Sequence, residues 1–110
     1  MEQIDHFAQK AALVATEHGF ETATLENMPT KLMLIVSEAA EALECLRDGT
    51  ALETSAKVPG VSNIEEELAD IVIRTLMTMY DLGFGLPSTA IFGKHDFNAT
   101  REHKHGGKAF

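Results

Sequence analysis

The sequence has few of the features that secreted or membrane proteins depend on. Cys45 is the only cysteine among the 110 residues, which excludes an internal disulfide and argues against a cysteine zinc site. No apolar run approaches the roughly 18 residues of a membrane-spanning helix, and no charged and then apolar leader is present. We therefore expect a cytoplasmic protein without a membrane partner.

Basic and aromatic residues are also scarce. The 9 Lys and Arg residues stand against 17 Asp and Glu residues, for a formal net charge of −8. This balance argues against a nucleic-acid polymer as a partner, because unspecific binding of DNA or RNA needs a basic surface. Aromatic residues make up only 6% of the chain and there is no Trp, whereas 45% of the residues are hydrophobic. These are mainly Leu, Ile, Val, Met and Ala, which suit the packing of helix on helix.

Apolar residues recur with the period of an α-helix in four segments, and no strand pattern is present. The first predicted helix covers residues 3–18, and the second runs from Pro29, which suits a first helical turn, to about 47. The third begins at the capping-box sequence 62–65 and ends near 82. The fourth spans about 87–100.

The predicted fold is therefore all-α, a four-helix arrangement in a single domain over residues 1–110. Residues 101–110 include two adjacent glycines and are expected to be an extended or mobile tail. A domain of this size buries a modest fraction of its surface, so association with further copies is expected.

Two pairs of acidic residues are the candidate functional residues. Glu38 and Glu41 lie three residues apart in the second predicted helix, and Glu67 and Asp70 have the same spacing in the third. Residues at i and i+3 share one face of a helix, about 4.5 Å apart along its axis. If the pairs face each other, they form a cluster of four carboxylates, which needs cations or shared protons where it is partly buried.

A simpler interpretation stays open at this point. Acidic residues at this spacing are common on solvated helix faces, and Asp70 could pair with Arg74 one turn further on. The second helix, however, is apolar nearly all round, which predicts that it is covered on most sides. Oxygen ligands without nearby His or Cys suit Mg²⁺, with Mn²⁺ as a substitute.

The chain resembles the MazG-like all-α nucleoside triphosphate pyrophosphohydrolases from about residue 18 to 108. The resemblance rests on the E-x-x-E and E-x-x-D signature within residues 34–44 and 66–72. It implies a MazG-like bundle and Mg²⁺-dependent hydrolysis of a (deoxy)nucleoside triphosphate to the monophosphate and pyrophosphate. Housecleaning of non-standard nucleotides is the role that it suggests. By resemblance, the catalytic and metal-binding residues are Glu38, Glu41, Glu67 and Asp70, and one of them or Glu66 orients the attacking water.

The end of the chain also resembles that of the family, through Lys94, Asn98, Arg101 and residues 105–108. By resemblance, Lys94, Asn98 and Arg101 contact phosphate or sugar, whereas from spacing alone Lys94 and Asn98 are an exposed polar pair. Family members assemble as dimers or tetramers with the site at or near subunit contacts, so the resemblance implies a homodimer or homotetramer.

Two positions depart from the family pattern. Ser37 stands where many members have a further Glu, and Glu21 stands where many have Trp. The number of cations and the preferred base are therefore not carried over. Two alternatives to this function remain: a non-enzymatic helical dimerisation or adaptor module, and a pyrophosphatase of the same superfamily that acts on a substrate such as phosphoribosyl-ATP.

Overall fold

The computed structural model describes residues 1–101, and the chain folds into four α-helices over this range. They are α1 (Gln3–Glu17), α2 (Met28–Arg47), α3 (Asn63–Leu82) and α4 (Pro87–Ala99). In the described part of the chain the only β-type pairing is an isolated bridge between Thr54 and Ser62. The prediction of an all-α fold with four helices is confirmed. The predicted tail lies outside the described residues except for Arg101, which is exposed.

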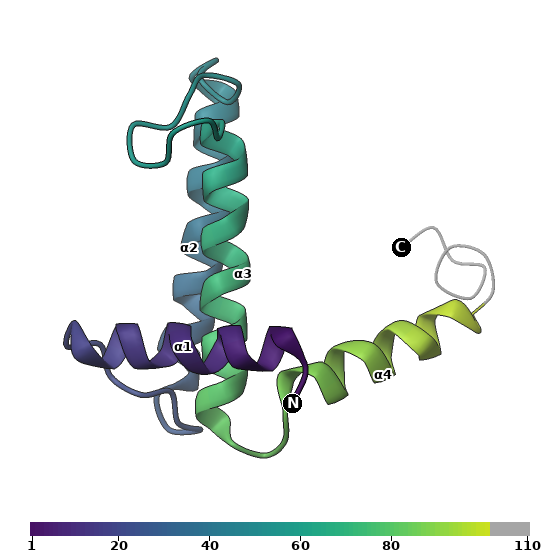
Figure 1. The fold of residues 1–110 in the computed structure, drawn as a ribbon. Helices are drawn as coiled ribbons and strands as arrows, with labels where there is room; N and C mark the ends of the chain where they lie inside the picture. Colours follow the sequence, from purple (N-terminus) through teal and green to yellow (C-terminus); the bar gives the residue numbers. More distant parts are fainter. Residues whose placement is uncertain (102–110) are drawn as a thin grey trace.

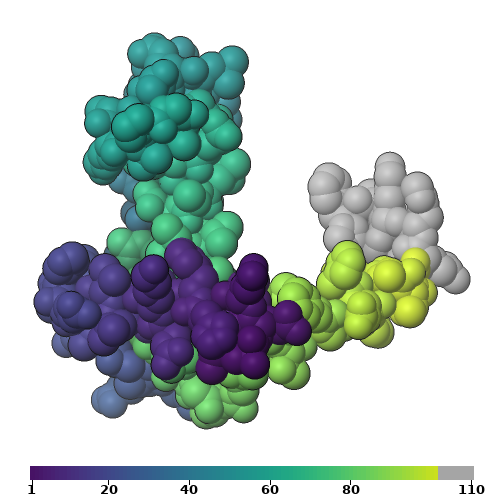
Figure 2. Space-filling model, in the orientation of Figure 1, coloured from purple at the N-terminus to yellow at the C-terminus, as the bar shows by residue number. Residues whose placement is uncertain are grey.

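The helices form a branched shape. Helices α2 and α3 lie side by side as a column, α1 crosses α3 at a steep angle, and α4 extends away from the column (Figure 1). Figure 2 shows the same outline in space-filling form, with α4 as a separate arm. Within residues 1–101, α4 packs on α1 and α3 but not on α2, and α1 does not pack on α2. A single chain therefore does not close its four helices into a bundle.

Local sequence fixes the ends of α3. The Ser62 side chain accepts a hydrogen bond from the Glu65 backbone N–H, and the Glu65 carboxylate accepts one from the Ser62 backbone N–H. This reciprocal capping box satisfies two N–H groups at the helix start. Gly83 follows the helix with φ of 70°, a left-handed conformation that glycine adopts without steric cost.

The core is small and made largely of alanines. The buried apolar residues among those described are Ala8, Ala12, Ala23, Ala42, Ala51, Leu76 and Pro87. Ala42 is the only buried residue of α2, whereas Leu32, Val36 and Leu43 on that helix are about half exposed. The expectation that α2 is covered on most sides is therefore wrong for a single chain, because only α3 packs along it.

A buried carboxylate joins the first turns of α1 and α4. Asp5 in α1 is fully buried and accepts hydrogen bonds from the Ser88 backbone N–H at 2.8 Å and the Ser88 hydroxyl at 2.5 Å. Burial raises the pKa of Asp5, but the hydrogen bonds from Ser88 and from the Glu2 backbone, together with the N-terminal charge, outweigh it, so the net pKa is lowered. This contact fixes the start of α4 against α1. In residues 1–101, no helix combines the length and the apolar character needed to cross a membrane.

Removal of the α3 cap tests this account of the fold. Ser62→Ala is expected to lower the free energy of unfolding by about 1 kcal/mol, because Glu65 and the first turn lose the capping hydroxyl. Urea unfolding followed by circular dichroism measures this loss. Ser37→Ala, at an exposed position within α2, serves as the control and is expected to change stability by less than about 0.5 kcal/mol. Equal effects of the two substitutions would contradict the assigned role of Ser62.

Candidate metal centre and the adjoining pocket

Three of the four predicted carboxylates meet between α2 and α3. Glu38 comes from α2, and Glu67 and Asp70 come from successive turns of α3. Each offers one carboxylate oxygen, and these oxygens all lie within 4.8 Å of one another. All three residues are partly buried, which places the cluster at the seam of the two helices. We call these three residues the carboxylate cluster.

Glu41 lies next to this cluster on the more exposed side of α2. A side-chain hydrogen bond with Glu38 is the largest cause of its raised pKa, followed by the charges of Glu38 and Glu67. Glu41 is therefore close enough to interact electrostatically with carboxylates of both helices. It is not one of the three residues whose oxygens converge. All four predicted carboxylates thus lie in one region.

The cluster brings several negative charges together in a partly buried environment. Burial is the largest cause of the raised pKa of Glu67, and the charge of Asp70 adds to it. Burial also raises the pKa of Asp70, with the charge of Glu38 as the next cause, while Lys57 and Arg74 act in the opposite direction. Both effects disfavour the ionised form, so a bound cation would stabilise the cluster.

Arg74 is the cation in direct contact with the cluster. Its Nε donates a hydrogen bond to Oε1 of Glu38 at 2.8 Å, and the two side chains are only 26% and 12% exposed. The sequence suggested a pair between Arg74 and Asp70 on the same helix, but the structure pairs Arg74 with the neighbouring helix instead. The sequence reasoning missed this residue as part of the site; the available signal was its position on the same face of α3 as Glu67 and Asp70.

Glu66 has a different role from its neighbour Glu67. Ser55 Oγ donates a hydrogen bond to Oε1 of Glu66, and the Lys57 ammonium lies 4.0 Å from Oε2. The same Ser55 hydroxyl accepts hydrogen bonds from the backbone N–H groups of Lys57 and Val58. Glu66 therefore holds the loop between α2 and α3 against the start of α3.

The carboxylate cluster fits a hard divalent cation. Two oxygens bound to one Mg²⁺ at about 2.1 Å can lie at most about 4.2 Å apart. The oxygens lie within 4.8 Å of one another, slightly beyond that limit, so a single bound ion would draw the side chains closer together. The ligands are all oxygens, as Mg²⁺ and Mn²⁺ prefer, and Oε2 of Glu38 is not used by Arg74. Glu38, Glu67 and Asp70 are thus able to hold such an ion.

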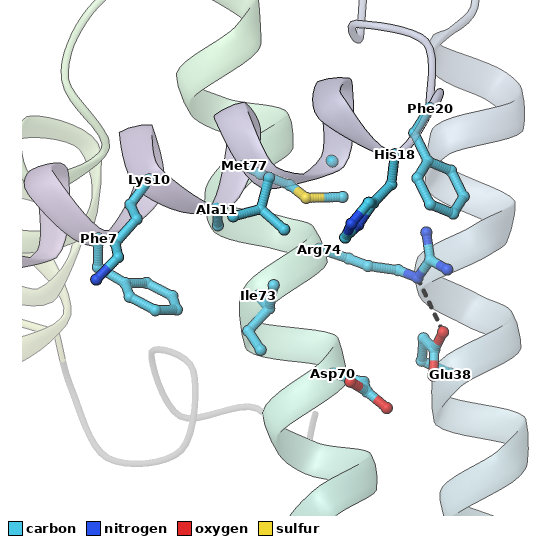
Figure 3. Close-up of a pocket in the computed structure, with 12 residues that line it drawn as sticks. Phe7, Lys10, Ala11, His18, Phe20, Glu38, Asp70, Ile73, Arg74 and Met77 are labelled. Atoms are coloured by element: carbon cyan, nitrogen blue, oxygen red, sulfur yellow. Dashed lines mark hydrogen bonds and ion pairs between the residues drawn. The ribbon is translucent and has the colours of Figure 1, made fainter.

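An open pocket of about 490 Å³ adjoins the cluster. It lies under α1 and faces α3, and Glu38 and Asp70 stand at its edge (Figure 3). Most of its wall is apolar, and polar side chains contribute at a few places. The lining residues are Phe7, Lys10, Ala11, Val14, Ala15, His18, Phe20, Glu38, Asp70, Ile73, Arg74 and Met77. A ligand in this pocket would contact the acidic cluster at one end and apolar side chains at the other.

The three residues predicted to bind substrate lie elsewhere. Lys94 and Asn98 are exposed on α4, and Arg101 follows that helix. The Lys94 ammonium and the Arg101 guanidinium lie 4.8 and 5.9 Å from the centre of the Phe97 ring. Because α4 points away from the column, one chain does not bring these residues to the carboxylate cluster (Figure 1).

Comparison with known proteins adds no assignment. The chain matches no protein-family model, no curated protein and no solved structure.

The raised pKa of Glu67 predicts how the stability of the metal-free protein depends on pH. A carboxylate whose pKa is raised on folding destabilises the folded protein above that pKa. The penalty shrinks as the pH falls through the folded pKa and disappears only below the pKa of the unfolded chain, which is about 4.3 for Glu. Without metal, Glu67→Gln is expected to raise the unfolding midpoint by a few degrees at pH 7 and by clearly less near pH 4.5. Differential scanning fluorimetry measures both.

Glu44→Gln is the matched control, because Glu44 is an exposed carboxylate on α2 whose side chain is 60% exposed. It should leave the midpoint unchanged at both pH values. A lower midpoint for Glu67→Gln at pH 7 would show that Glu67 is not under electrostatic strain.

Proposed function

We propose that the protein is a nucleoside triphosphate pyrophosphohydrolase that uses Mg²⁺, with Mn²⁺ as a substitute. The observation that supports this most is the shared edge between the carboxylate cluster and the apolar pocket, where Glu38 and Asp70 belong to both. A nucleotide has the same two-part character, with a charged phosphate chain and a flat, largely apolar base. The resemblance to the MazG-like enzymes implies the same reaction, which yields a nucleoside monophosphate and pyrophosphate.

The division of labour follows from the charges. Glu38, Glu67 and Asp70 would hold the divalent cation, which offsets the repulsion between the cluster and a triphosphate and polarises the phosphoryl group. Arg74 keeps Glu38 directed into the cluster through its 2.8 Å hydrogen bond. Phe7, Phe20 and Met77 would bind the base by apolar contact and exclude water from it.

Glu41 suits the role of proton acceptor for the attacking water better than Glu66. Both oxygens of Glu66 already interact, one with the Ser55 hydroxyl and one with the Lys57 ammonium. Glu41 is exposed, and its pKa is raised by the neighbouring carboxylates. A raised pKa improves the ability of a carboxylate to take up a proton near neutral pH.

Self-association is part of the proposal. A single chain leaves Leu32, Val36 and Leu43 of α2 about half exposed and projects α4 into solvent (Figure 2). A second copy packed on α2 would bury this apolar face, and the assembly would be a homodimer or a homotetramer. It would also allow Lys94, Asn98 and Arg101 from one copy to approach the acidic site of another.

A non-enzymatic dimerisation or adaptor module is the alternative from another class, and it would need no cation at the cluster. Three partly buried like charges beside a pocket are a poor design for a purely structural helix pair, because burial and repulsion both destabilise them. A substrate such as phosphoribosyl-ATP remains compatible with the same site.

Pyrophosphate release tests the reaction. With Mg²⁺ and a panel of nucleoside triphosphates and phosphoribosyl-ATP, the wild-type protein is expected to release pyrophosphate and the corresponding monophosphate. Chelation of the metal should abolish the activity. Glu67→Gln and Asp70→Asn should each lower kcat/KM by at least about 100-fold, because each removes a charged ligand.

Glu44→Gln again provides the control and should keep wild-type activity. Release of orthophosphate alone, or pyrophosphate release that survives both chelator and Asp70→Asn, would refute the proposed reaction. Lack of any Mn²⁺ binding in calorimetry would instead support the adaptor module.

The oligomer is tested by sedimentation equilibrium. The wild-type protein is expected to sediment as a dimer or tetramer, and Val36→Glu should shift it toward monomer because a charge would be buried in the interface. Lys31→Glu, at the amino-terminal end of the same helix, is the control. A wild-type monomer at micromolar concentration would contradict the proposed assembly.

A further inference from the structure

The polar side chains of the pocket divide by charge. Glu38 and Asp70 stand at the edge shared with the carboxylate cluster, whereas the rest of the lining contributes Lys10, His18 and Arg74. The ammonium of Lys10 and the guanidinium of Arg74 can only donate hydrogen bonds. Apart from the two cluster residues, the pocket lining thus offers donors and no carboxylate, and Arg74 stands beside the cluster through its bond to Glu38.

Arg74 has hydrogen-bond donors that no described residue uses. Among the hydrogen bonds within residues 1–101, its Nε donates to Glu38, and its two terminal Nη groups have no protein acceptor. The side chains of Lys10 and His18 likewise make no hydrogen bond to the described residues. Since a guanidinium is planar and rigid, the bond to Glu38 fixes the direction of its free end. Figure 3 shows this group among the residues that line the pocket, in the same region as His18 and Phe20.

We propose that Arg74 selects nucleotides with a 6-oxopurine base, such as guanine or hypoxanthine, over adenine. The O6 and N7 atoms of a 6-oxopurine are adjacent acceptors that match the two Nη groups of an arginine. Adenine has an amino group in place of O6. That amino group is a donor, so it cannot accept a hydrogen bond from the Nη groups of Arg74. The pocket, at about 490 Å³, has room for a purine, and Phe7 and Phe20 provide aromatic surface for it. This inference rests on the proposed function, since it assigns the pocket to the base.

Binding of two monophosphates that differ at the 6-position and in the proton on the adjacent N1 tests the selection without turnover. IMP carries O6 where AMP carries an amino group, and calorimetry or ligand-observed NMR gives both affinities in chelator and in Mg²⁺. The wild-type protein is expected to bind IMP at least about tenfold more tightly than AMP, since one bidentate contact discriminates by roughly that factor or more.

Two substitutions separate the role of Arg74 in recognition from its role in holding Glu38. Arg74→Gln should reverse the preference toward AMP, because a glutamine amide matches the N6 and N7 atoms of adenine. Arg74→Lys keeps the charge near Glu38 but loses the paired donors, so it should remove the preference without favouring AMP. Arg47→Gln, at an exposed site on α2, should leave the preference unchanged.

The outcomes distinguish the two proposals. Equal affinities of the wild-type protein for IMP and AMP, binding of neither, or a preference that survives Arg74→Gln would overturn the inference. Pyrophosphate release without discrimination between ITP and ATP would overturn it while leaving the proposed reaction intact. A clear preference for IMP in a protein that releases no pyrophosphate would retain the inference and refute the reaction.

Discussion

Three carboxylates from two helices are held within 4.8 Å of one another, closer than like charges prefer in a partly buried place. Burial and mutual repulsion raise the pKa values of Glu67 and Asp70, and a single contact with Arg74 offsets only part of this charge. Such an arrangement costs folding stability unless a cation binds there. The packing of α2 on α3 and the proposed chemistry both depend on what offsets this repulsion.

The fold places each part of the site by a different means. The close packing of α2 on α3 brings the carboxylates together, and the capping box at Ser62 fixes where α3 begins relative to Glu67. Helix α1 crosses α3 at a steep angle (Figure 1), and the apolar pocket beside the cluster is lined by residues of these two helices, together with residues 18 and 20 and Glu38. The contact between Asp5 and Ser88 fixes the start of α4 against α1, and α4 extends away from the column (Figure 1).

Local signals predicted the helices well, because caps, glycines and apolar periodicity act over a few residues. The ends of α3 at Asn63 and Leu82 follow from the capping box and Gly83. The i, i+3 spacing indicated that each acidic pair shares one side of its helix, but it left open whether Glu38 meets Glu67 and Asp70 or faces solvent. The partner of Arg74, the pocket and the direction of α4 were not predictable, because they depend on how helices far apart in the sequence pack. The exposure of α2 has the same cause: its pattern indicates a covered helix, and one chain covers it only in part.

The most direct test of the account is a crystal structure of the protein with Mn²⁺, using the anomalous signal of the metal. The account predicts a peak between α2 and α3 with oxygens of Glu38, Glu67 and Asp70 at about 2.1–2.2 Å, and loss of that peak in crystals of Asp70→Asn. A cluster without any anomalous peak at saturating Mn²⁺, or a peak confined to other residues, would contradict the claim that these carboxylates are a cation site.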